Sequence, residues 1–223
     1  MRLSVFRGGF TRDAAQMIAG ATSPVLARLV DKSFVQRIDD ERFDIHELLR
    51  QYAAQQFADT SAQQLAQDAH SAYYLAFLHQ CEPALAGPGQ IETIAALEAD
   101  FENIRAAWQW AVQRRRYALV DWALEGLFRW FWLKRSRQLE GQALLRHALV
   151  QWTPESGQAP HPAWARIIAR IIEQQQGSWL TAVDNGALAQ ALAIARQQDN
   201  QAEVAFCLWV RGLAFVSERH VAP

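Results

Sequence analysis

Apolar and polar positions follow helical and strand-like periods in turn along the first 60 residues. One helical period lies between Thr11 and Gly20, the expected N-cap and C-cap, and a second covers 24–32. Strand-like alternation follows over 34–38 and 42–45, and a helical period then returns. The pattern predicts two helices, a β-hairpin and a third helix, which is the order of a winged-helix arrangement.

The helix after the hairpin is predicted to bury one face. Asp44 and Glu47 stand three positions apart before it, the spacing of a capping box, and this places His46 in the first helical turn. Backbone N–H groups are unpaired at a helix start and the dipole is positive there, so such a turn can hold a phosphate with the imidazole as an added donor. The expected inner face has one polar member and consists of Leu48, Leu49, Tyr52, Ala53, Gln56 and Phe57.

The next segments have a helical period throughout. Residues 61–85 predict a long helix, 86–89 a break, and 94–111 a helix packed along its length. The apolar stripe expected on the first of these consists of Leu65, Ala69, Tyr73 and Phe77. The most hydrophobic run, 117–133, predicts a buried helix rather than a membrane span, because one stripe of it is charged: Asp121, Glu125 and Arg129.

A faint internal repeat follows Trp164. A shift of 35 residues places Ala169 on Val204, Ile172 on Cys207, Gly177 on Gly212, Leu180 on Phe215 and Ala187 on Ala222. This period is close to the 34 residues of a tetratricopeptide helix pair. The predicted fold class is therefore mainly α, a winged-helix domain with one small β-hairpin followed by an α-helical, tetratricopeptide-like solenoid.

The predicted organisation has three parts. Residues 1–60 form the winged-helix domain, 61–160 a helical linker with the first tetratricopeptide-like helix pairs, and 161–223 further repeats. Both the first and the last part are expected to be truncated.

The composition is that of a globular chain, and the charge gives no sign of binding to a polyanion. Hydrophobic residues make up 51% of the chain, charged residues 20%, and the formal net charge is −1, so no basic footprint for nucleic acid or an anionic membrane is visible. Cys81 and Cys207 have neither metal-site spacing nor the number for a disulfide framework. Reduced thiols and an N-terminus without a signal peptide favour a cytoplasmic protein.

No constellation for catalysis or metal binding is visible in the sequence. There is no Gly-x-x-x-x-Gly-Lys-Ser/Thr loop, and the only lysines, Lys32 and Lys134, lack a preceding glycine. There is also no His-Glu-x-x-His pattern and no Gly-x-Ser-x-Gly elbow. The sequence therefore predicts a chain that is not an enzyme by itself, with no catalytic and no metal-binding residue.

Five segments carry a resemblance to a known family. Segments 3–10, 29–35 and 46–53 resemble the winged helix of STAND-class signalling ATPases, the group that includes the NB-ARC and apoptotic-ATPase switches. Segments 97–107 and 139–145 resemble the helical region that follows it in bacterial members. The resemblance implies a nucleotide-binding domain that precedes residue 1, and ADP or ATP as the cofactor of the full-length family.

The family's Met-His-Asp motif corresponds to Ile45-His46-Glu47 in this chain. The resemblance implies that His46 touches the β-phosphate of ADP held by the nucleotide-binding domain. It further implies a non-catalytic regulatory role, with a protein or small-molecule effector on the helical repeats.

Two other functions remain open from the residues themselves. One is a free-standing tetratricopeptide-like interaction module that makes no use of His46. The other is a DNA-binding winged-helix regulator whose recognition helix would be 24–32. DNA binding is disfavoured, because the wing is net acidic: it carries Arg37 and Arg42 beside Asp39, Asp40, Glu41 and Asp44.

Overall fold

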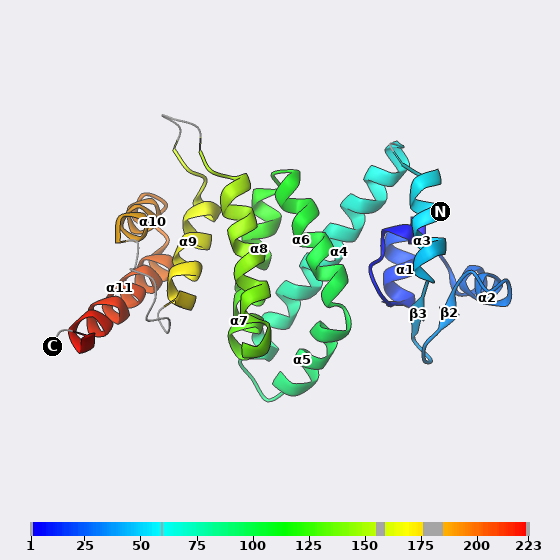
Figure 1. The fold of residues 1–223 in the computed structure, drawn as a ribbon, viewed down its shortest axis with the longest axis horizontal. Helices are drawn as coiled ribbons and strands as arrows, with labels where there is room; N and C mark the ends of the chain where they lie inside the picture. The colour runs from blue at the N-terminus through cyan, green and yellow to red at the C-terminus, as the bar shows by residue number, and fades with distance from the viewer. Residues whose placement is uncertain (1, 59, 155–158, 176–184, 222–223) are drawn as a thin grey trace. The chain divides into compact units, whose positions relative to one another are not determined.

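The chain is mainly helical, as predicted, with one small antiparallel sheet (Figure 1). The computed structural model describes residues 2–58, 60–154, 159–175 and 185–221. It divides into two compact units, Met1–Arg114 and Arg115–Pro223. The expected parts 1–60, 61–160 and 161–223 group the residues differently, because the helix that begins at Ser61 packs against elements of the first 60 residues.

The first unit begins with short elements around the sheet. They are the 3-10 helix η1 (Arg2–Val5), β1 (Phe10–Thr11), α1 (Arg12–Ala19), α2 (Ser23–Asp31), β2 (Gln36–Arg37), β3 (Arg42–Asp44) and α3 (Glu47–Gln56). The strand order is β1-β3-β2, and all pairs are antiparallel. The hairpin is confirmed, whereas β1 was not predicted, because two residues are too few to show a period.

Local chemistry explains where the first helices begin and end. The Thr11 hydroxyl accepts a hydrogen bond from the Ala14 N–H at 3.1 Å, and Gly20 adopts φ 67° to close α1. Both predicted caps are therefore confirmed. In α2 the N-cap is Thr22, and Pro24 lies in the first turn, where its missing N–H removes no helical hydrogen bond.

The core of the first unit lies between α4 (Ser61–Leu85) and α6 (Phe101–Gln113), which run side by side (Figure 1). The helical run predicted over 94–111 is interrupted at Asp100, which separates α5 (Gln90–Ala99) from α6. Of its six expected inner positions, Ile94 is half-buried and the others are buried: Leu97, Phe101, Ile104, Trp108 and Ala111.

The stripe predicted on α4 is wrong by one position. Leu65 is 64% exposed, and the buried residues one step along are Ala66, His70, Tyr74 and Leu78. Two polar side chains, His70 and Ser71, lie on the true inner face because each has a partner on α6. The His70 ring pairs with Asn103, and the Ser71 hydroxyl donates to the Ala107 carbonyl at 2.8 Å. Because this buried face contains polar residues, the pattern of hydrophobic positions wrongly placed it on the outside of the helix.

The second unit consists of helices that pack around α9. They are α7 (Tyr117–Leu133), the 3-10 helix η2 (Arg135–Arg137), α8 (Gln138–Gln151), α9 (Pro162–Gln175), α10 (Asn185–Gln197) and α11 (Gln201–Val221). The helix predicted over 117–133 is confirmed at both ends. None of the described helices is long and apolar enough to cross a membrane.

Part of the predicted repeat can be located in this unit. Ala169, Ile172 and Cys207 are buried in one core, and Val204 packs against it. Gly177, Leu180 and Ala222 lie outside the described residues, as does the side chain of Phe215. The tetratricopeptide-like arrangement therefore stays a prediction.

Candidate functional site

His46 is the N-cap residue of α3 and does not lie in its first turn. The ring Nδ1 accepts a hydrogen bond from the Leu48 N–H at 3.3 Å. The predicted capping box is wrong, because both carboxylates have other partners. Asp44 accepts from the Ile45 N–H at 2.8 Å, and Glu47 accepts from Arg50 and Gln51 on the next turn.

The cap defines the chemistry of the exposed imidazole. Because Nδ1 accepts a hydrogen bond, the proton of the neutral His46 ring is on Nε2. Among the described residues, Nε2 has no partner, and the side chain is exposed at the positive end of α3. One neutral donor therefore stands at a helix start, an arrangement that suits a bound anion.

Half of the predicted inner face of α3 is turned toward solvent, whereas Leu49, Ala53 and Phe57 are half-buried. Leu48 is 68% exposed and Tyr52 is 63% exposed, and no residue of α3 is buried. The opposite side is held by Arg50, whose guanidinium donates to the Ser4 carbonyl at 3.3 Å and to Glu47 at 2.7 Å. We call His46, Leu48 and Tyr52 the α3 surface.

A buried amide fixes the loop between η1 and β1. Asn103 of α6 accepts the Arg7 N–H at 2.7 Å through Oδ1 and donates to the Gly9 carbonyl at 2.9 Å through Nδ2. The Nε2 atom of His70 lies 3.2 Å from the same Oδ1. Because Oδ1 can only accept, His70 donates from Nε2 and its Nδ1 carries no proton.

The hairpin is anchored to the start of α6 by a charged pair. The Arg42 guanidinium donates to Asp100 Oδ1 at 2.9 Å and to Oδ2 at 3.2 Å, and also to the Ala99 carbonyl at 3.0 Å. The hydrogen bond that Arg42 donates to Asp100 raises the pKa of Arg42. From the sequence, Arg42 counted only among the charges of the wing, and Asn103 and His70 were missed, because the partners of these residues are distant in the chain.

Burial depresses the pKa of His70 to about 4 from the ordinary 6.5, with the Arg7 charge adding to the effect. Between these values the unfolded chain binds a proton that the folded chain does not. We expect the free energy of unfolding to fall by about 3 kcal/mol from this group as the pH drops from 6.5 to 4. Chemical denaturation at a series of pH values measures this loss.

The variant His70→Gln isolates that contribution, because glutamine keeps a donor for Asn103 but does not titrate. The difference in stability between the native chain and the variant should shrink as the pH falls below 6.5. A difference that stays constant down to pH 4 would contradict a neutral, buried His70.

The two cysteines and the possible metal ligands are further candidates for a site. Burial raises the pKa of Cys81 and of Cys207 to about 11, so both are poor nucleophiles. Within the described ranges, His, Cys, Asp and Glu residues form no group of three or more that could hold a metal ion.

Comparisons of this chain with protein-family models, with curated proteins and with solved structures find no match.

Proposed function

We propose that this chain is a non-catalytic regulatory segment of a STAND-type signalling ATPase of the cytoplasm. Its first unit is a winged helix that reports the ADP state of a nucleotide-binding domain, and its tetratricopeptide-like helices bind a protein or small-molecule effector. The observation that carries the proposal is the α3 surface, where an unpaired imidazole donor stands beside two exposed apolar side chains.

Each part of the α3 surface has a role in this scheme. The His46 Nε2–H donates to the β-phosphate of ADP, a charge-assisted hydrogen bond. Leu48 and Tyr52, one helical turn apart, are covered by the nucleotide-binding domain. The motif Ile45-His46-Glu47, at which the family resemblance is centred, supplies the imidazole.

The charges of the hairpin support this function over DNA binding. Arg37 pairs with Asp40 at 2.6 Å, and Arg42 is held by Asp100 at 2.9 Å. Both basic side chains of the wing therefore have carboxylate partners, whereas a wing that tracks a phosphate backbone offers free positive charge.

The switch is a two-state equilibrium. With ADP bound, the α3 surface holds the first unit against the nucleotide-binding domain. An effector on the second unit favours the open arrangement, in which ADP exchanges. The effector can shift this equilibrium only by its difference in affinity for the two states.

His46→Asn tests the phosphate contact without removing the helix cap. Asparagine is a good N-cap but has no donor at the position of Nε2. In a fusion of this chain to a STAND nucleotide-binding domain, we expect ADP to dissociate about 10- to 100-fold faster, as for the loss of one charged hydrogen bond. His46→Ala should show the same loss and also lower the free energy of unfolding by about 1 kcal/mol. Stopped-flow release of a fluorescent ADP measures the rate.

The matched control is His161→Asn. The Nδ1 atom of His161 accepts the Ala163 N–H at 3.2 Å, so this ring makes the same kind of hydrogen bond at the start of α9. The control variant should release ADP at the native rate. If His46→Asn releases ADP no faster than His161→Asn, His46 has no nucleotide-sensing role and a free-standing interaction module is favoured.

A further inference from the structure

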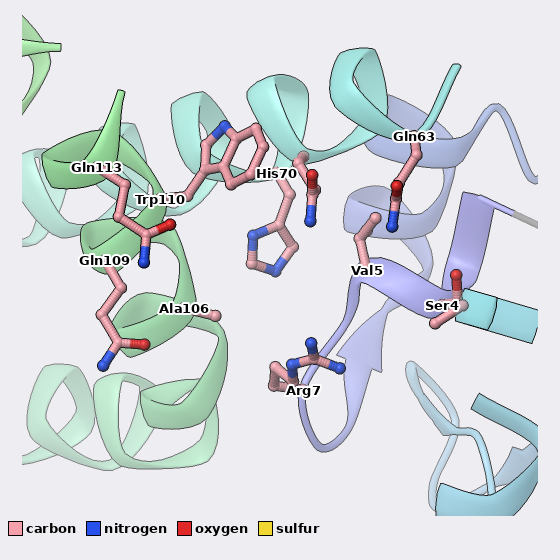
Figure 2. A pocket seen from close by; sticks show the side chains of 11 residues that line it. Ser4, Val5, Arg7, Gln63, His70, Ala106, Gln109, Trp110 and Gln113 are labelled. Atoms are coloured by element: carbon pink, nitrogen blue, oxygen red, sulfur yellow. The ribbon is translucent and has the colours of Figure 1, made fainter. Parts of the chain in front are cut away.

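A polar cleft of about 200 Å³ lies between α4, α6 and the segment from Ser4 to Arg7 (Figure 2). Two glutamines one turn apart on α4, Gln63 and Gln67, and two one turn apart on α6, Gln109 and Gln113, line it. Each carboxamide offers both donors and an acceptor. The volume is below the range for drug-sized or nucleotide ligands, about 300–1,000 Å³, so the cleft suits a small molecule.

His70 gives this cleft an unpaired acceptor. The ring is only 3% exposed and lines the cleft. Its Nε2–H is used by Asn103, and its depressed pKa keeps the ring neutral. The Nδ1 lone pair therefore has no partner among the described residues. A ligand hydroxyl or amide N–H is the complement of such an atom.

Arg7 gives the cleft its single charge. His70 is neutral, and none of the other lining residues is ionisable. Figure 2 shows the Arg7 side chain below the His70 ring, and the charge of Arg7 lowers the pKa of that ring. The backbone N–H of Arg7 is fixed by Asn103 at 2.7 Å, so the charge is carried by an anchored segment.

We propose that this cleft binds a small monocarboxylate that also carries a hydroxyl or amide donor. Arg7 binds the carboxylate, the His70 Nδ1 accepts from the donor, and the four glutamines pair with the remaining polar groups. Amino acids with a free ammonium group are disfavoured, because no carboxylate lines the cleft. The site is separate from the α3 surface and does not depend on the function proposed for it.

Three probes of this class test the proposal on the full chain: D-glycerate, D-gluconate and succinamate. Histidine labelled with ¹⁵N reports on Nδ1, whose resonance shifts when the atom accepts a hydrogen bond. At least one probe should shift the His70 Nδ1 signal saturably. Propionate, which lacks the donor, and glycerol, which lacks the carboxylate, should bind at least tenfold more weakly than that probe. The proposal is overturned if all three probes fail, if propionate binds as well, or if inorganic phosphate binds more tightly.

Arg7→Gln should weaken the binding of the successful probe at least tenfold, because it removes the charge while the backbone N–H remains for Asn103. The control is Arg105→Gln, an arginine on α6 that pairs with Glu102 and does not line the cleft. Circular dichroism checks that both variants are folded. Equal affinity of the two variants for the probe would overturn the assignment of Arg7.

Discussion

Replacing Asn103 by leucine is expected to lower the free energy of unfolding of the first unit by about 3–5 kcal/mol. Leucine is close in volume, so the loss reports on hydrogen bonding rather than on a cavity. The leucine side chain cannot form hydrogen bonds, so the Arg7 N–H, the Gly9 carbonyl and the His70 Nε2–H lose their partner. Each buried group left unpaired costs about 1–3 kcal/mol. Urea denaturation followed by circular dichroism measures the change.

The control for this variant is Gln109→Leu, which removes an exposed carboxamide from the same helix. It should change the stability by no more than about 0.5 kcal/mol. If Asn103→Leu changes the free energy of unfolding by no more than Gln109→Leu does, the hydrogen bonds of Asn103 contribute little to stability. Water would then satisfy the three groups that Asn103 binds.

The second large effect is expected in the second unit, for Arg170→Met. Arg170 is buried on α9 and donates to Glu125 of α7 and Glu203 of α11. Its guanidinium carbon also lies 4.0 Å from the centroid of the Phe206 ring. Methionine keeps much of the apolar volume of arginine but not its charge. Arg166 is then the one cation paired with the carboxylates of Asp121, Glu125 and Glu203 in this cluster of described residues. The expected loss is about 3–5 kcal/mol, as for a buried charge deprived of its partner.

Two further variants define the origin of that loss. Arg105→Met breaks an exposed pair with Glu102 and should cost at most about 1 kcal/mol. The double variant Arg170→Met with Glu203→Gln removes one positive and one negative charge together. It should be less destabilised than the sum of its single variants. Full additivity would contradict an electrostatic cause.

The period of apolar residues was enough to locate most elements. Helix α7 begins and ends where the hydrophobic run does, and α1 lies between the two caps read from Thr11 and Gly20. These features depend on neighbours in the chain, so they are visible in a short window of sequence. The strand β1 escaped detection, because it exists only through its pairing with β3.

The faces of the helices were harder to predict. On α4 the buried face contains His70 and Ser71, which are tolerated there because Asn103 and Ala107 of α6 satisfy them. On α3 the apolar positions Leu48 and Tyr52 face outward, because Arg50 takes the side that contacts η1. In both cases a polar side chain has taken an inner position that a hydrophobicity scale assigns to an apolar one.

The sequence by itself therefore determined the mainly helical class, the order of most elements and the place of His46 at the start of a helix. Only the tertiary structure decided that His46 caps α3 through Nδ1 and that the α3 surface is exposed. It also decided that Asn103 holds His70 and the Arg7 backbone, and that both of these residues line one cleft. The physical reason is that burial of a polar group depends on a partner that can lie many residues away. His70 and Asn103 are 33 positions apart. Local periodicity carries no information about such a pair.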